Sequence, residues 1–266
     1  MSNSYLIDDV KYKQSGSFSL GSLSFYIPKQ QITSIIGPNG SGKSTTLRLM
    51  ANLLKPDNGC VFIEGKEISQ IGHKQLARKM TMLSQIQNVQ MDIVVRDLVS
   101  HGRLPHCKWH ERLGLQDQKL IDWALSVTSL THLQFRSLQT LSGGERQRAW
   151  IAMAIVQSPE ILLLDEPTTY LDISHQLELM NLVEYLNSEL HMTIVMVLHD
   201  LNQAAKYSDR LVVMKEGKIF REGSPGEVFD TALFKDVFSI EAKIFKENGV
   251  PYFIPLGLAR NQQAAQ

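Results

Sequence analysis

Along this chain, short runs of apolar residues alternate with longer segments in which apolar positions recur every three or four residues. The short runs predict buried strands, and the longer segments predict helices with one face toward a core. Because the two kinds alternate, the pattern predicts parallel strands joined by crossover helices, that is, an α/β fold. The predicted buried strands are Ile32–Ile36, Ile161–Leu164 and Thr193–Leu198, and the predicted helices are Thr45–Leu54, Val94–Arg103, Gln116–Leu130, Ser142–Gln157 and Ser174–Leu190.

The N-terminal part of the chain has a different pattern. Tyr5–Val10 and Phe18–Ile27 alternate between apolar and polar residues and are broken by Gly and Ser, which predicts antiparallel β-structure. Cys60–Glu64 predicts a further strand, because the turn residues Pro-Asp-Asn-Gly at 56–59 end the helix before it.

The C-terminal part predicts two hairpins with a short helix between them. Leu211–Glu222 has Glu216-Gly217 at its middle, the second hairpin turns near Asn248-Gly249, and the short helix covers Pro225–Phe238. No repeat or Gly/Ser-rich linker divides the chain. The expected organisation is one domain over residues 1–240, a helical subdomain within it at about 86–157, and a C-terminal hairpin extension over 241–266.

Composition narrows the function classes. Apolar residues make up 43% of the 266 positions, which is ordinary for a globular protein, and 27 basic side chains balance 27 acidic ones. A chain of net charge +0 has no overall field that attracts nucleic acid, so we expect no nucleic-acid partner. No apolar stretch reaches the roughly 18 residues of a membrane span, and Asp8 and Asp9 interrupt the N-terminus where a secretory signal would be apolar. The two cysteines, Cys60 and Cys107, are too few for a disulfide framework.

A glycine-rich segment between a predicted strand and a predicted helix carries the first chemical signal. Residues 37–45, Gly-Pro-Asn-Gly-Ser-Gly-Lys-Ser-Thr, fit the pattern G-x-x-x-x-G-K-S/T. Glycines allow successive backbone N–H groups to surround phosphate oxygens, and a helix N-terminus adds positive partial charge. Lys43 would reach the β- and γ-phosphates, and the Ser44 hydroxyl would bind Mg²⁺. The segment therefore predicts a nucleotide site.

The second signal is a pair of carboxylates directly after the apolar run Ile161–Leu164. In a parallel sheet this run would deliver Asp165 and Glu166 beside the phosphate-binding loop. We expect Asp165 to help hold Mg²⁺ and Glu166 to act as the general base that polarises the attacking water.

A third signal is the segment Leu-Ser-Gly-Gly-Glu-Arg-Gln-Arg at residues 141–148. It predicts a helix whose cap, Ser142, and whose first amides, from Gly143 and Gly144, are available to an anion. A chain with one phosphate-binding loop has no obvious need for a second phosphate-binding helix N-terminus. Such a need arises if two copies face each other and each completes the nucleotide site of the other.

These motifs and their order resemble the ATP-binding cassette (ABC) ATPases over nearly the whole chain. The resemblance implies a P-loop NTPase fold with a RecA-like core, an antiparallel β subdomain and a helical subdomain. It also implies two cofactors, ATP and Mg²⁺, and a dimer of cassettes. It assigns ATP contacts to Tyr12, Gly37, Pro38, Asn39, Gly40, Ser41, Gly42, Lys43, Ser44, Thr45 and Gln85.

The resemblance further implies roles that spacing alone does not show. Tyr12, 25 positions before Gly37, corresponds to an aromatic residue that stacks on adenine, although a strand tyrosine with no such role is the alternative. Gln85 corresponds to a glutamine that contacts Mg²⁺ together with Ser44 and Asp165, and His199 to a histidine that contacts the γ-phosphate. The implied catalytic residues are Glu166, His199 and Lys43, and the implied contacts to the ATP of the partner chain come from Ser142, Gly143, Gly144 and Asp172.

Several segments are similar to one branch of the family, the ATPase subunits of iron–siderophore, haem and vitamin B12 importers. They include Thr168–Asp172, His199–Ala205 and Gly223–Val228. This branch implies separate membrane permease subunits that dock near Gln85–Gly114, an indirect link to a substrate-binding protein, and a location at the cytoplasmic face of the cell membrane. Iron–siderophore uptake is the favoured activity. Haem or vitamin B12 import, an export ATPase and a non-transport ABC switch remain as alternatives.

One cluster permits a competing interpretation. His101, His106, Cys107 and His110 carry metal-binding side chains, with His106 and His110 four residues apart. Pro105 and Trp109 indicate an irregular loop, and no second cysteine or carboxylate pair completes a metal site. The aromatic and arginine residues of the same segment suit a protein interface better.

Overall fold

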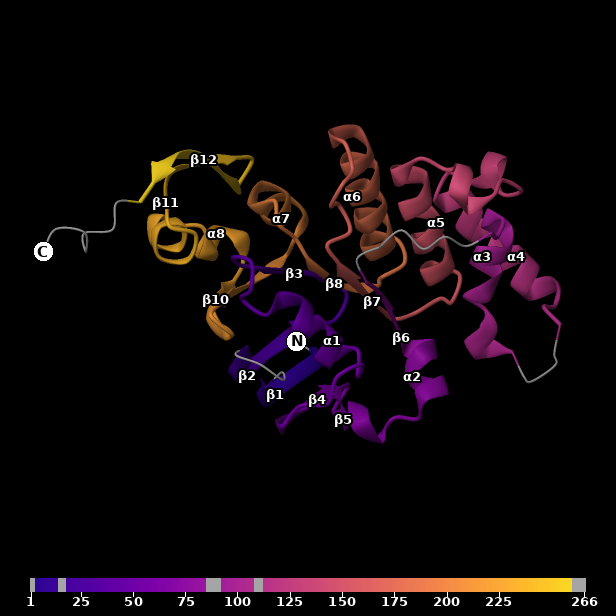
Figure 1. Ribbon diagram of the computed structural model, residues 1–266, viewed down its shortest axis with the longest axis horizontal. Helices are drawn as coiled ribbons and strands as arrows, with labels where there is room; N and C mark the ends of the chain where they lie inside the picture. The colour runs from indigo at the N-terminus through magenta and orange to yellow at the C-terminus, as the bar shows by residue number, and fades with distance from the viewer. Residues whose placement is uncertain (1–2, 14–17, 85–91, 108–111, 260–266) are drawn as a thin grey trace, which may run out of the picture.

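A computed structural model describes residues 3–13, 18–84, 92–107 and 112–259 of the chain (Figure 1). Its centre is a six-stranded sheet in the order β10-β9-β3-β8-β7-β6, parallel except for β10. The strands of this sheet are β3 (Ile32–Ile36), β6 (Met80–Leu83), β7 (Ile161–Asp165), β8 (Thr193–Val197), β9 (Arg210–Lys215) and β10 (Lys218–Gly223).

The central strands are apolar throughout because both faces of the sheet are covered. In β7, Leu162 and Leu164 face one core while Ile161 and Leu163 face the other. The first core lies under α3 (Val95–His101), α4 (Leu115–Val127), α5 (Gly143–Ile155), α6 (Ile173–Ser188) and α7 (Leu201–Tyr207). The second lies between the sheet, α1 (Lys43–Met50), α2 (His73–Lys79) and the N-terminal β-structure.

The N-terminal β-structure is a separate sheet in the order β2-β1-β4-β5, with antiparallel pairing throughout, as the sequence predicts. Its strands are β1 (Asn3–Lys13), β2 (Ser19–Pro28), β4 (Asn58–Ile63) and β5 (Lys66–Glu67). Figure 1 shows α3, α4 and α5 grouped at one end of the molecule, away from this sheet. These three helices all fall within residues 86–157.

The C-terminal hairpin pairs β11 (Ile240–Glu247) with β12 (Val250–Leu258), and Asn248-Gly249 lies between them as predicted. Phe253 of β12 packs against Phe229 and Phe234. The side chain of Asn202 on α7 bonds both backbone groups of Phe253, which attaches the hairpin to the central body.

Two helix predictions differ from the structure. The helix predicted over Thr45–Leu54 begins at Lys43 and ends at Met50, because Asn52 has a left-handed backbone with φ 56°. The helix predicted over Pro225–Phe238 is divided into α8 (Pro225–Val228) and a π-helical turn at Leu233–Val237. Between them the Asp230 carboxylate accepts a bond from Leu233 N and pairs with Arg221, which stops α8 from continuing. Two more helices, α2 and α7, have no counterpart in the prediction.

Within the described ranges, none of the helices is both long and apolar enough to cross a lipid bilayer.

Candidate nucleotide-binding site

A cavity of about 560 Å³ lies at the edge of the central sheet where β3, β7 and β8 end. Parallel strands place their following loops at one edge, which is why segments far apart in sequence meet here. The residues that line the cavity are Phe18, Asn39, Gly40, Gly42, Lys43, Ser44, Thr45, Glu166, Thr169, Tyr170 and His199.

The loop after β3 forms one wall of this cavity. Gly40 and Gly42 have φ angles of 76° and 101°, a left-handed backbone that other residues adopt only with strain. A Cβ atom at Gly40 would meet nothing within 4 Å, so the space beside this glycine is open. Helix α1 starts directly after Gly42 with no side-chain cap, which leaves its first N–H groups for an anion.

Lys43 extends back along this loop. Its ammonium donates to the carbonyl oxygens of Gly37 at 2.9 Å and Pro38 at 3.0 Å. Burial lowers the pKa of Lys43, and the nearby Glu166 and Asp165 carboxylates oppose that shift. The two carbonyls accept bonds from the ammonium, and the two carboxylates favour its charged form.

Ser44 and Asp165 form a pair of oxygen ligands. The Ser44 hydroxyl donates to Asp165 Oδ1 at 2.8 Å across the gap between α1 and β7. Asp165 is 4% exposed, and burial raises its pKa although the Ser44 bond lowers it. A buried carboxylate beside a hydroxyl suits a hard divalent cation such as Mg²⁺, which prefers oxygen ligands and would stabilise the charged carboxylate.

Glu166 and His199 meet because β7 and β8 are neighbours. His199 Nε2 lies 2.6 Å from Glu166 Oε1, and the other carboxylate oxygen accepts a bond from Thr169 Oγ1 at 3.4 Å. Glu166 has φ 53°, so the chain turns sharply after Asp165 and points the two carboxylates in different directions. One carboxylate thereby faces Ser44 and the other faces the histidine.

Some predicted contacts lie elsewhere. Gly37, Pro38 and Ser41 form the base of the loop but do not line the cavity. Tyr12 lies on β1 opposite Leu20, half-buried against the second core, and it also does not line the cavity. Gln85 lies outside the described residues.

Phe18, Thr169 and Tyr170 are cavity residues to which the sequence analysis gives no role. Phe18 is the first residue of a predicted strand, and in sequence it resembles a core residue. In the structure it directly precedes β2 and lines the cavity beside the loop at residues 37–45. Tyr170 is 90% exposed with φ 66°, so the cavity rim presents an aromatic ring to solvent.

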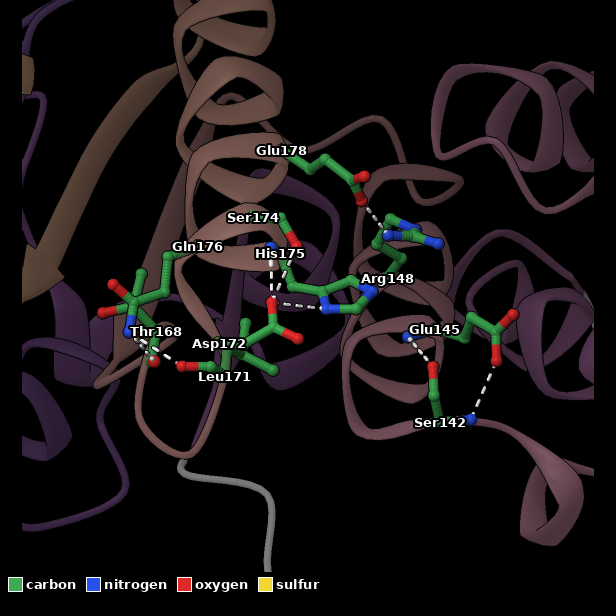
Figure 2. Close-up of polar contacts among 10 residues, drawn as sticks. All are labelled: Ser142, Glu145, Arg148, Thr168, Leu171, Asp172, Ser174, His175, Gln176 and Glu178. Atoms are coloured by element: carbon green, nitrogen blue, oxygen red, sulfur yellow. Dashed lines mark hydrogen bonds and ion pairs between the residues drawn. The ribbon is translucent and has the colours of Figure 1, made fainter.

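The segment 141–148 lies apart from this cavity. Ser142 caps α5: its hydroxyl accepts from Glu145 N at 3.3 Å, and Ser142 N donates to the Glu145 carboxylate at 2.8 Å (Figure 2). The hydroxyl keeps its own proton for donation to another group. Ser142, Gly143 and Gly144 are not among the residues that line the cavity, so one chain does not bring the two anion-binding features together.

Asp172 also acts as a cap. Its carboxylate accepts from His175 N at 2.9 Å at the start of α6.

The proposed metal-binding cluster shows ordinary partners instead: His106 Nε2 bonds Gln157 O, and the Cys107 thiol lies 3.5 Å from Arg103 O, while His110 lies outside the described residues. Among described side chains, no group of three or more His, Cys, Asp or Glu could hold a metal ion.

The fold and the cavity define a P-loop ATPase of the cassette type. A family model described as ABC transporter matches residues 20–169. The chain therefore belongs to the ABC transporter family, and its enzymatic activity is the hydrolysis of ATP. The predicted family and fold class are confirmed.

Similar proteins include import subunits and solved cassettes. The chain is 49% identical to the petrobactin import ATP-binding protein FpuC of Bacillus anthracis, over 96% of this chain and 93% of that protein. It is 42% identical to the iron(3+)-hydroxamate import ATP-binding protein FhuC of Bacillus subtilis (strain 168), over 91% and 90%. The dimeric bacterial cassette MJ0796 superposes with a TM-score of 0.71 at 29% identity, over 83% of this chain and 98% of that one.

A metal-chelate type ABC transporter in an inward-facing conformation has a TM-score of 0.84 at 24% identity, over 96% of this chain and 98% of that chain. That likeness extends through most of the chain and confirms the fold.

Proposed function

We propose that this chain is the ATP-hydrolysing subunit of an importer for iron–siderophore complexes. The observation that carries the ATPase assignment is the convergence of Lys43, Ser44, Glu166 and His199 on one cavity. Asp165 lies directly behind this lining, where it accepts a bond from Ser44. The substrate class is supported by relatives such as FpuC and FhuC, whose names specify petrobactin and iron(3+)-hydroxamate import.

Each residue of the cavity has a role in this proposal. The loop amides and Lys43 bind the phosphates of ATP, and the ammonium leaves the carbonyls of Gly37 and Pro38 to do so. Ser44 and Asp165 hold Mg²⁺, and Gln85 is proposed as a further ligand. When bound, Mg²⁺ supplies positive charge that offsets the charge of the phosphates.

Glu166 acts as the general base and His199 orients it. The 2.6 Å contact between them fixes the carboxylate at the mouth of the cavity, where it can take a proton from water. His199 can then turn its Nε2 toward the γ-phosphate. Tyr12 remains a proposed adenine contact, and Phe18 offers a second aromatic surface nearer the loop.

A second cassette completes the site. Ser142, Gly143 and Gly144 of one chain bind the ATP held on the loop of the other, and Asp172 lies at the same interface. Support comes from the separation of these residues from the cavity of their own chain and from the dimeric structure of MJ0796. Exposed Tyr170 and Ile173, 90% and 77% accessible, supply apolar surface for such a contact beside the cavity.

We further propose that membrane permease subunits dock on the helical subdomain near Gln85–Gly114, at the cytoplasmic face of the membrane. The substrate-binding protein is linked only through the permease, and nucleic acid has no part in the activity. Arg78 and Lys74 bond the carbonyls of Pro105 and Cys107, so the described part of this segment is tied to α2 and the sheet.

Uptake by cells tests the proposal. In a strain that lacks this chain but retains its permease, the wild-type chain should restore uptake of radiolabelled iron bound to a siderophore. Glu166→Gln should not restore it, whereas Glu160→Gln, a matched change of an exposed carboxylate outside the cavity, should. Restored uptake of haem or vitamin B12 without iron–siderophore uptake would overturn the substrate class. Full rescue by Glu166→Gln would overturn the role of ATP hydrolysis.

A further inference from the structure

Gly143 and Gly144 are adjacent in sequence but have opposite surroundings. A Cβ atom at exposed Gly143 would meet nothing within 4 Å. A Cβ atom at buried Gly144 would lie 2.4 Å from Cδ2 and 2.6 Å from Cγ of His175. Neither glycine has the left-handed backbone that excludes other residues. Within one chain, the imidazole of His175 is therefore what requires glycine at position 144.

The imidazole is held in place by the residue that caps its own helix. Asp172 Oδ1 lies 2.7 Å from His175 Nδ1 and also accepts from His175 N and Ser174 Oγ, each at 2.9 Å. Figure 2 shows the ring lying between Asp172 and the first turn of α5. The bonds from His175 and Ser174 lower the pKa of the Asp172 carboxyl, so this cap stays charged at neutral pH.

Other contacts fix the same turn of α6 on both sides. Arg148 on α5 pairs with Glu178 one turn further along α6. On the opposite side, Gln176 Nε2 donates to Leu171 O at 2.9 Å and Gln203 Nε2 of α7 donates to Gln176 Oε1 at 2.6 Å. The loop that carries Asp172 is thus attached to α6, and α6 is attached to α5.

We propose that His175 is a positioning residue that joins the start of α6 to Gly144, so that Asp172 and the segment Ser142–Gly144 move as one unit when two cassettes associate. This inference rests on the proposed composite site between two chains. His175 is not among the residues that line the cavity, and its effect is transmitted through the position of Gly144.

A double-mutant cycle tests the coupling of the two residues. Gly144→Ala, His175→Ala and the double variant are compared for kcat, KM for ATP, ATP-dependent dimer formation and thermal stability. Gly144→Ala should lower kcat by about tenfold with His175 present, and by less than about twofold in the His175→Ala background. The affinity of the isolated chain for a fluorescent ATP analogue should not change in any variant. Gly143→Ala, alone and with His175→Ala, is the matched control, and its cost should be the same in both backgrounds.

His175→Asn provides a second readout. Asparagine can keep a bond to Asp172, so this variant should have a higher kcat than His175→Ala. The two variants should have similar melting temperatures. An equal cost of Gly144→Ala in both backgrounds, or a His175→Ala variant with wild-type kcat and dimer formation, would overturn the inference. If wild-type chains hydrolyse ATP without forming dimers, the composite site is wrong instead, while coupling between residues 144 and 175 would still appear in thermal stability.

Discussion

The N-termini of α1 and α5, both proposed to bind the phosphates of ATP, differ in how they are constructed. Before α1, Gly40 and Gly42 allow the left-handed φ angles that the loop requires, and no side chain caps the helix. At α5, Ser142 and Glu145 form the helix cap. Glycine at position 144 leaves room for the imidazole of His175, which fills the space that a Cβ atom would occupy.

The surroundings differ as well. The N-terminus of α1 faces Asp165, Glu166 and His199 from two neighbouring strands, so it lies in a cavity with groups that can bind a metal and activate water. At the N-terminus of α5, Ser142 and Gly143 are exposed, and His175 of α6 packs against Gly144. In the proposed composite site, the first region of one chain supplies the catalytic groups, and the second region of the partner chain covers them.

The largest expected effect separates chemistry from binding. Glu166→Gln removes the proposed general base at the first region but keeps the shape of the cavity, so ATP hydrolysis should fall by at least about a hundredfold. Association of chains in the presence of Mg-ATP should persist, as measured by light scattering. Hydrolysis at the rate of the Glu160→Gln control would show that another group activates the water.

The next effect separates the two regions from each other. Lys43→Ala removes the proposed charged bond to phosphate and should weaken binding of ATP by the single chain about tenfold to a hundredfold. Ser142→Arg should leave that affinity unchanged but abolish ATP-dependent dimers, because the long cation obstructs the surface of α5. Lys55→Ala and Ser126→Arg, at exposed positions elsewhere, serve as controls. Equal loss of single-chain affinity in both variants would remove the distinction between the regions.

The smallest effect concerns the caps. The pKa of Glu145 is lowered, chiefly by the bond from Ser142 N, so its charged form stabilises the fold above its ordinary pKa of 4.5. That contribution is lost as the pH falls through the lowered value. Glu145→Gln should therefore cost about 0.5 kcal/mol at pH 7, and the difference from wild type in urea unfolding should vanish on acidification. Helix α1 has no acidic residue in its first turn and no such dependence. A cost that is independent of pH would mean that the Glu145 charge does not stabilise α5.

Sequence patterns predict much of this architecture because its central strands are apolar on both faces and its loop motif has a backbone requirement. For these reasons the sequence predicts the strand Ile32–Ile36, the loop at residues 37–45 and the pair Asp165-Glu166. The residues that a pattern misses act through three-dimensional contact. In sequence, Phe18 resembles any strand residue and His175 resembles any helix residue. Only the fold shows that Phe18 lies beside the loop at residues 37–45 and that His175 packs on Gly144.

Helix ends were predicted less well than helix positions. The end of α1 depends on the left-handed backbone at Asn52, and the break after α8 depends on Asp230, whose partners Arg221 and Leu233 are assembled only by the fold. The roles of Tyr12 and Gln85 remain predictions, since the first lies away from the cavity lining and the second lies outside the described residues.

The central claim is that α5 of one chain covers the loop at residues 37–45 of another, and a cross-link between chains tests it directly. One chain carries Asn39→Cys and the other Ser142→Cys, both exposed positions, in a background with Cys60→Ser and Cys107→Ser. With a short bifunctional reagent, a covalent dimer should form in Mg-ATP when the two variants are mixed, and neither variant alone should form it. The account would be contradicted if the mixture stays monomeric in Mg-ATP, or if either single variant cross-links as readily as the pair.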